Sequence, residues 1–274
     1  REGTEVKVAD LIRGIVIQSG NDASVAMAEF IAGDEQAFAD IMNQVAQKLG
    51  MTRTQFKNAT GLPNEGHYTT AKDLSLLARA LIRDFPEHYK VYKEKYFSYN
   101  DIRQANRNSL LWRDDAVDGM KTGHTQAAGF CLVASAEKKE LRLISVVMGA
   151  TSERSRSTES QKLINYGFRY FESVKLYDGL ESLKRVQVWA GLHESLDVGI
   201  EAPVQLTIPN GARGALAAEV TLDPVIKAPV GHGQTLGLLR ISLEGETLLE
   251  RPVVALNAVD EAGFVSSLID EVSL

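Results

Sequence analysis

A lysine, a threonine and a glycine stand together at the head of an apolar run in residues 117–136, VDGMKTGHTQAAGFCLVASA. Gly123 lacks a Cβ and therefore lets another backbone approach a strand closely. Lys121 and Thr122 would then present a cation and a hydroxyl beside a strand edge, which suits an extended peptide that ends in a carboxylate. The alternative is a solvated turn that leads into a hairpin.

A second polar motif, Ser19-Gly20-Asn21, interrupts apolar residues between two expected helices. A serine hydroxyl can both donate and accept a hydrogen bond, as proton relay requires. Alternatively, Asn21 or Asp22 serves only as the N-cap of the following helix. Another Ser-x-Asn, at 98–100, lies in an aromatic, strand-like stretch, and we assign it no role.

Together, the two motifs resemble those of the serine penicillin-recognising enzymes, with Lys121 lying 102 residues after Ser19. The resemblance covers essentially the whole chain and points to the low-molecular-mass D-alanyl-D-alanine carboxypeptidases of the penicillin-binding protein 5/6 group. It is carried by LIRGIVIQSGNDASVAMAEFIAG, TGLPNEGHYTTAKDLSLLARALI, NRNSLLW, the stretch quoted above and the β-rich second part. It implies an α/β (α+β) penicillin-recognising serine transferase/β-lactamase-like catalytic domain, followed by a smaller all-β sandwich domain.

The nucleophile motif of this family, Ser-x-x-Lys, does not precede Ser19. The only Ser-x-x-Lys in the sequence is SAEK at 135–138, which follows Lys121 in an expected hairpin turn, and we interpret it as coincidence. The chain begins with Arg1 rather than methionine, and we expect the nucleophile in a segment that precedes it.

The implied reaction is acyl transfer on a peptidoglycan stem pentapeptide. A serine attacks the carbonyl between two D-alanines, the terminal D-alanine leaves, and water releases the acyl-enzyme. β-Lactams would acylate the same serine as covalent inhibitors. By the same resemblance, Ser19 would relay a proton toward the leaving amine, Asn21 would bond the substrate amide, and Lys121 would supply positive charge.

The resemblance also implies a set of substrate-binding residues. Lys121 would attract the substrate carboxylate and Thr122 would bond it. Gly123 would allow close approach, and the backbone N–H of His124 would form half of an oxyanion hole. Arg156 would bind the terminal carboxylate, because a guanidinium offers a matching fork of donors.

Other charged residues have competing interpretations. Arg154 and Arg142 leave the register of the carboxylate-binding arginine open, and a solvated role for Arg156 is the alternative. Arg107 is a candidate for the wall of the site. Asp73 is expected in the first turn of a helix, where a carboxylate complements the helix dipole.

Two alternative functions remain at this stage. A class A β-lactamase shares the fold and motifs, but its second motif is Ser-Asp-Asn rather than Ser-Gly-Asn, and about one hundred residues of β structure follow the catalytic part here. A non-catalytic peptidoglycan-binding scaffold would keep the pocket without the chemistry.

Composition disfavours other classes of partner. The 274 residues carry a net charge of −6 with no basic run, which argues against a nucleic-acid partner. The single cysteine, Cys131, excludes an internal disulfide framework and a cysteine-based zinc site. The five histidines show no metal-ligand spacing, so neither a metal nor a cofactor is expected.

Periodicity and composition divide the chain near residues 171–180. We expect a catalytic domain over 1–172 with helices over 8–18, 22–32, 34–50, 69–85 and 155–174 and a hairpin over 129–150. Short strand-like segments with turn signals about every ten residues predict a β-rich domain over 173–274. The inner faces should include Phe38, Ile41, Met42, Val45 and Leu49 of the third helix, and Leu163, Ile164, Gly167, Phe168 and Phe171 of the last.

The resemblance also implies a location. Peptidoglycan lies outside the cytoplasmic membrane, so we expect a periplasmic protein, peripheral on the outer face of the bacterial inner membrane. Family members attach through an amphipathic C-terminal helix, which this chain does not contain in full. Residues 264–274, FVSSLIDEVSL, could be its start.

Overall fold

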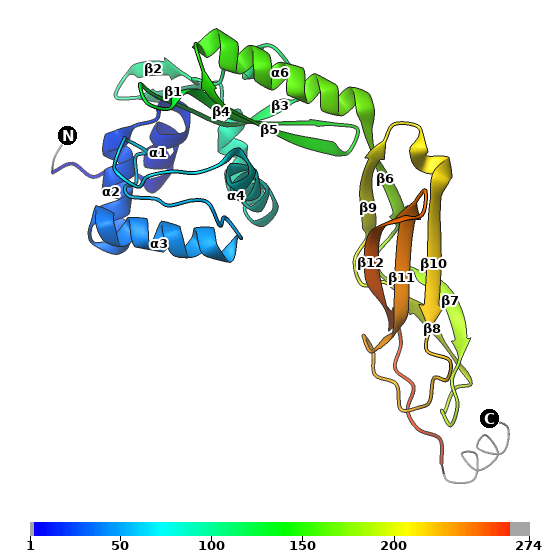
Figure 1. Cartoon of the computed structure of the whole chain (residues 1–274). Coiled ribbons are helices and arrows are strands. Elements are labelled where there is room, and N and C mark those ends of the chain that lie inside the picture. The colour runs from blue at the N-terminus through cyan, green and yellow to red at the C-terminus, as the bar shows by residue number, and fades with distance from the viewer. Residues whose placement is uncertain (1–2, 264–274) are drawn as a thin grey trace. The chain divides into compact units, whose positions relative to one another are not determined.

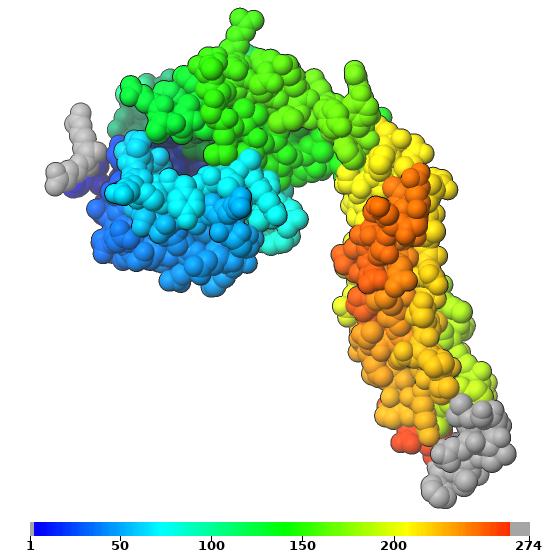
Figure 2. All heavy atoms as spheres, in the orientation of Figure 1, coloured from blue at the N-terminus to red at the C-terminus, as the bar shows by residue number. Residues whose placement is uncertain are grey.

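The computed structural model describes residues 3–263 and divides the chain into two compact units, Arg1–Arg169 (unit 1) and Tyr170–Leu274 (unit 2). Unit 1 has helices around a three-stranded sheet, and unit 2 consists mainly of strands (Figure 1). Figure 2 shows unit 1 in blue to green and unit 2 in yellow-green to red. Residues 264–274, the candidate start of an anchor helix, lie outside the described residues.

The N-terminal half of unit 1 is helical, as its apolar spacing predicts. Its elements are α1 (Val8–Arg13), η1 (Gly14–Gln18), α2 (Asn21–Ala32), α3 (Glu35–Lys48), α4 (Ala71–Asp84), α5 (Pro86–Tyr89) and η2 (Lys90–Lys93). Asp34 caps α3 by accepting from the Ala37 amide, and Thr70 caps α4 by accepting from the Asp73 amide. The predicted helix over 8–18 needs one correction, because its last turn, η1, is a π-helix.

The buried face of α3 differs from the predicted one. Ile41 and Val45 are exposed, whereas Ala39 and Ala46 are buried. Between the two alanines, Asn43 exchanges two hydrogen bonds of 2.7 and 2.9 Å with a loop backbone. Positions 39, 43 and 46 share one helical face. The inward face is therefore rotated toward small and polar residues that anchor the loop.

The sheet of unit 1 carries the Lys-Thr-Gly motif. Strands β3 (Val117–Thr125), β4 (Gly129–Lys138) and β5 (Leu141–Ala150) pair antiparallel in that order, and β4 and β5 confirm the predicted hairpin over 129–150. Leu132 shares an apolar cluster with Ile164 of α6 (Glu153–Tyr170), whereas Val133 packs against the cluster that contains Ala78 of α4. Neighbouring strand residues point to opposite faces, so α6 and α4 cover opposite sides of the sheet (Figure 1).

Helix α6 differs from the predicted helix over 155–174 at both ends. It ends earlier because Phe171 begins β6 (Phe171–Tyr177), which pairs with β9 (Val204–Pro209). Ile164 and Gly167 are buried as predicted, but Leu163 is half exposed. Strand pairing therefore overrides the helical spacing at the end of this segment.

A small hairpin lies beside η1 in unit 1. It consists of β1 (Tyr96–Tyr99) and β2 (Ile102–Ala105) and is followed by η3 (Ser109–Trp112). The second Ser-x-Asn, at 98–100, lies at its turn.

Unit 2 has two antiparallel sheets around one apolar core. The two-stranded sheet is β6–β9, and the five-stranded sheet has the order β10-β11-β12-β8-β7. The remaining elements are β7 (Ser182–Gln187), β8 (Ser195–Gly199), η4 (Ala212–Ala215), β10 (Leu216–Leu222), β11 (Thr235–Leu243) and β12 (Glu246–Ala255). Val204 and Ile208 of β9 share a core with Leu239, Ile241 and Val253 of the larger sheet. The predicted β-rich second part is confirmed.

Candidate active site

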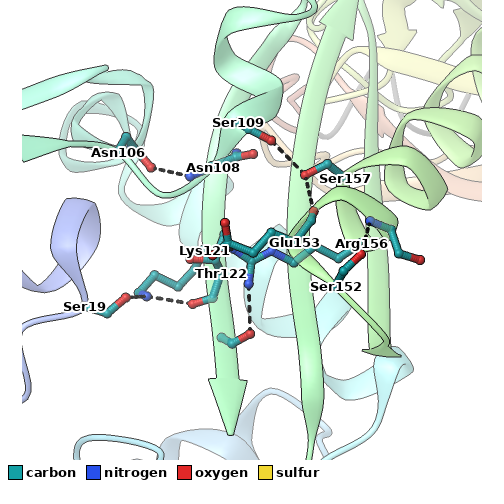
Figure 3. Close-up of polar contacts among 12 residues, drawn as sticks. Ser19, Asn106, Asn108, Ser109, Lys121, Thr122, Ser152, Glu153, Arg156 and Ser157 are labelled. Carbon is teal, nitrogen blue, oxygen red and sulfur yellow. Dashed lines mark hydrogen bonds and ion pairs between the residues drawn. The ribbon is translucent and has the colours of Figure 1, made fainter.

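The two sequence motifs meet in unit 1, at a pocket of about 400 Å³. It is lined by Ser19, Asn21, Thr60, Gly61, Leu62, Arg107, Lys121, Thr122, Gly123, His124, Thr125, Phe130, Glu153 and Arg156. All seven residues predicted for the site lie on this lining. Figure 3 shows Ser19 reaching toward Lys121 on β3, with Arg156 and Glu153 approaching from α6.

Ser19 owes its position to the π-helical turn before it. The backbone N–H of Ser19 bonds back into η1, and the residue has left-handed backbone angles, φ 58° and ψ 45°. Such angles are unfavourable for a residue with a Cβ and often mark functional sites. The turn lies between the end of η1 and the start of α2 at Asn21, and it places both Ser19 and Asn21 on the pocket lining. No side-chain cap starts α2, which argues against the interpretation of Asn21 as an N-cap.

Lys121 lies on β3 and joins the two motifs. Its ammonium donates to the Ser19 hydroxyl and, over 2.8 Å, to the Thr122 carbonyl. Burial lowers the pKa of Lys121 to about 8, with smaller contributions from the positive charges of Arg107 and Arg156. A lysine with such a pKa can change its protonation state near neutral pH.

The residues after Lys121 differ in what they expose to the pocket. The Thr122 side chain is buried, whereas Gly123 and His124 are exposed. A Cβ built on Gly123 would meet only Cys131, at 3.9 Å, so the space beside this backbone is open. The His124 ring stacks on Phe130 of β4 at 3.9 Å between centroids. The stacking fixes the ring against the sheet and leaves the strand backbone accessible.

Arg156 is held in the first turn of α6 and is only 3% exposed. Its Nη1 donates to the Gly123 carbonyl over 3.2 Å, and its guanidinium lies 5.6 Å from the Phe130 ring centroid. The start of α6 is fixed by Ser152, whose hydroxyl accepts from the Ser155 amide. The Ser157 hydroxyl, one residue beyond Arg156, bonds that of Ser109 at 2.8 Å (Figure 3).

Buried amides support β3 from behind. The Asn108 side chain donates to the Gly119 carbonyl over 3.0 Å. The Asn108 backbone N–H donates to the Asn106 side-chain oxygen over 2.9 Å. Both asparagines are buried. Hydrogen-bonded buried polar groups specify one backbone position, because breaking them leaves unsatisfied atoms. This support fixes the strand two residues before Lys121.

Two other sequence features lie away from the pocket lining. Asp73 is in the first turn of α4, as expected, and accepts from the Thr54 hydroxyl and the Arg53 amide. The SAEK segment lies at the end of β4, where Ser135 is buried against Arg142, and Lys138 is paired with Asp114. Neither Ser135 nor Lys138 lines the pocket.

The sequence reasoning missed four parts of the site. The loop over residues 60–62, Thr125, Phe130 and Glu153 all line the pocket. Phe130 is paired with His124 in the β3–β4 register, so the predicted hairpin could have placed it there. Glu153 lies in a polar stretch without periodicity, and only its spacing of three from Arg156 offered a signal.

Within residues 3–263, no group of three or more histidine, cysteine, aspartate or glutamate side chains could hold a metal ion. In the same part of the chain, no helix has the length and apolar character needed to cross a membrane. The pocket combines the three cationic side chains of Arg107, Lys121 and Arg156 with four hydroxyl side chains and an accessible strand backbone. This arrangement can bind an extended peptide that ends in a carboxylate.

Comparisons with known proteins agree with this arrangement. The family model for D-alanyl-D-alanine carboxypeptidases matches residues 1–152, and the model for the C-terminal domain of penicillin-binding protein 5 matches residues 171–261. The chain therefore belongs to the D-alanyl-D-alanine carboxypeptidase family of serine peptidases.

Relatives match over the whole chain. D-alanyl-D-alanine carboxypeptidase DacC of Escherichia coli K12 is 44% identical over 276 positions, which cover 100% of this chain and 69% of the relative. The structure of penicillin binding protein 5 from Haemophilus influenzae has a TM-score of 0.85 and 41% identity, covering 94% of this chain and 76% of that one. Penicillin-Binding Protein D2 from Listeria monocytogenes, in an ampicillin-bound form, has a TM-score of 0.56 and 34% identity, covering 60% of this chain and 68% of that one. These matches do not favour the β-lactamase and scaffold alternatives.

Proposed function

We propose that this chain provides the substrate-binding part of a serine-type D-Ala-D-Ala carboxypeptidase that removes the terminal D-alanine from peptidoglycan stem pentapeptides. The observation that carries the proposal is the contact between Lys121 and Ser19 in one pocket with Arg156. Residues 1–172 would form the catalytic domain and residues 173–274 the β-rich domain. β-Lactams, whose ring mimics the peptide, would acylate the enzyme.

The terminal carboxylate of the substrate is proposed to bind at the end of the pocket formed by β3 and α6. Lys121 supplies charge, the Thr122 hydroxyl donates a hydrogen bond, and Arg156 offers the guanidinium donors that face away from Gly123. The peptide lies along the accessible edge of β3, because Gly123 has no side chain to prevent it. The substrate bond to be cleaved then lies beside the loop that carries Ser19.

The proton and amide chemistry belongs to the other motif. Ser19 relays a proton to the leaving D-alanine nitrogen, because its hydroxyl both donates and accepts, and neighbouring Lys121 can exchange protons near neutral pH. Asn21 bonds the substrate amide. The backbone N–H of His124 donates to the developing oxyanion, and one such donor typically contributes about 3 kcal/mol of transition-state stabilisation.

The nucleophile and its base are proposed to come from a Ser-x-x-Lys segment that precedes Arg1. The test is to express the protein with its preceding segment and to measure both labelling by a fluorescent penicillin and D-alanine release from a peptide ending in D-Ala-D-Ala. One covalent label per chain together with D-alanine release supports the proposal. Absence of a label would instead support a binding scaffold. Penicillin hydrolysis without D-alanine release would support a β-lactamase.

We further propose a periplasmic location, with attachment to the outer face of the bacterial inner membrane through an amphipathic C-terminal helix. The relatives are bacterial D-alanyl-D-alanine carboxypeptidases by name, and a peptidoglycan substrate lies outside the cytoplasm. Fractionation of cells that produce the protein with and without residues 264–274 and any following segment tests the attachment. An unchanged membrane fraction after removal would contradict it.

A further inference from the structure

One pocket residue carries a charge opposite to that of the other charged residues on the lining. Glu153 is the single acidic side chain on the described lining, where Arg107, Lys121 and Arg156 are positive. It lies in the first turn of α6, where the helix dipole favours a carboxylate. The Glu153 Oε1 lies 3.5 Å from the Arg156 Nη2.

The two partners of this contact differ in burial and in their other contacts. The Arg156 side chain is 3% exposed, and its Nη1 already donates to the Gly123 carbonyl, so the guanidinium is fixed. The Glu153 side chain is 73% exposed and reaches the guanidinium only at the outer limit of hydrogen-bonding distance. A loosely held carboxylate therefore lies against the Nη2 group of Arg156.

We propose that Glu153 is a built-in competitor for the substrate carboxylate. It pairs with Arg156 in the empty pocket, and a peptide carboxylate must displace it or bind beside it. The inference rests on the proposed role of Arg156 as carboxylate binder. It identifies Glu153 as a residue that sets affinity and limits the binding of other anions, because every anion meets the same opposing charge.

The physical consequence has a definite sign. Removing the Glu153 charge while keeping the shape of its side chain should strengthen binding of a carboxylate ligand, because both the competition and the repulsion disappear. The gain should shrink as salt rises, since an exposed charge is screened within about 8 Å at 0.15 M ionic strength. A ligand whose terminal carboxylate is replaced by an amide should gain nothing.

The test uses the 274-residue chain and isothermal titration calorimetry. The ligands are the tripeptide Lys-D-Ala-D-Ala with both lysine amines acetylated, and its C-terminal amide. The variants are Glu153→Gln and, as a matched control, Glu159→Gln, which removes an equally negative residue from α6 that pairs with Lys162 and does not line the pocket. Both positions are exposed, so both variants should fold.

We expect Glu153→Gln to bind the carboxylate tripeptide about three- to tenfold more tightly at low salt, with Glu159→Gln and all amide affinities unchanged. If both variants bound the carboxylate tripeptide equally and the wild type still preferred it over the amide, the competition by Glu153 would be overturned. The proposed carboxylate site at Arg156 would stand. A wild type that does not distinguish carboxylate from amide would overturn the proposed carboxylate site as well. Weaker binding of the carboxylate tripeptide by Glu153→Gln than by the wild type would also overturn the competition, because Glu153 would then support binding of the peptide.

Discussion

Unit 1 and unit 2 bury different kinds of side chain. Among residues 3–263, the nine buried polar or charged side chains all lie in unit 1: Asp73, Asn106, Asn108, Thr122, Ser135, Ser145, Arg156, Ser157 and Ser160. The buried residues of unit 2 are apolar, and the ion pairs of its larger sheet, such as Arg240–Glu250, are exposed. Burying a polar group costs free energy unless it is hydrogen-bonded. Arg156 and Asn108 offset this cost with hydrogen bonds that position the pocket, whereas Asp73 and Ser135 form theirs away from it.

Unit 2 is stabilised by the simpler means of apolar burial around one core. Its exposed ion pairs contribute little, because water screens them. Substitutions in the two units should consequently separate stability from function.

The largest effect is expected for Lys121. Lys121→Ala removes the ammonium that contacts Ser19 and, by our proposal, the charge that attracts the substrate carboxylate. We expect penicillin acylation to slow by at least about 100-fold in the protein that carries its preceding segment. The control is Lys184→Ala on the exposed strand β7 of unit 2, which should label at the wild-type rate. Similar slowing in both variants would contradict the assignment of function to unit 1.

Core substitutions should separate the units next. Leu239→Ala in unit 2 is expected to lower the free energy of unfolding by about 3 kcal/mol without changing peptide affinity. Asn108→Ala in unit 1 should lower it by about 2 kcal/mol, because the Gly119 carbonyl loses its partner. The Asn108 variant should also weaken peptide binding, since β3 is no longer held beside Lys121.

Each unit can be followed by its own tryptophan during urea unfolding. The chain has two, Trp112 in unit 1 and Trp189 in unit 2, so Trp112→Phe and Trp189→Phe backgrounds report one unit each. A loss of peptide affinity in Leu239→Ala would contradict the assignment of peptide binding to unit 1 alone.

How far the sequence predicts this molecule differs between its parts. The family resemblance carried by the motif residues, rather than their spacing alone, implied that Ser19 and Lys121 act in one site. The π-helical turn before Ser19 was not predicted, because η1 contacts β2 and β3, which lie far along the chain and leave no mark on the local apolar spacing. The apolar pattern also misplaced the inner face of α3, where Asn43 bonds a loop and draws Ala39 inward.

The pH dependence of Lys121 gives a third prediction with two opposite trends. In the folded chain, the ammonium loses its proton as pH rises through about 8, so affinity for a carboxylate peptide should fall, on the order of tenfold by pH 10. In the unfolded chain, a lysine keeps its proton up to about pH 10.4. The unfolded state therefore binds more protons between these values, and the contribution of Lys121 to stability should rise with pH.

Calorimetric titration between pH 7 and 10 checks the affinity trend, with Lys121→Arg as the control. Arginine keeps its charge throughout this range, so the affinity of that variant for the carboxylate peptide should not fall as the pH rises. In unit 2, the hydrogen bond and charge of Glu250 raise the pKa of Arg240. Arg240 therefore keeps its proton between pH 7 and 10 and does not contribute to the measured trend. A wild-type affinity that stays flat to pH 10 would contradict the titration of Lys121.

The smallest predicted effect separates backbone strain from chemistry at Ser19. Ser19→Ala and Ser19→Gly both delete the hydroxyl that contacts Lys121, so both should slow penicillin acylation equally. Only glycine adopts the left-handed backbone of this position without a steric penalty, so Ser19→Gly should be more stable than Ser19→Ala by about 1 kcal/mol in urea unfolding.

Glu244→Gly provides the same comparison in unit 2, at a turn with φ 51°, against Glu244→Ala. That pair should show a stability difference of the same sign without any change in acylation. If Ser19→Gly instead restored acylation relative to Ser19→Ala, the backbone geometry of this loop, rather than its hydroxyl, would be what the pocket requires.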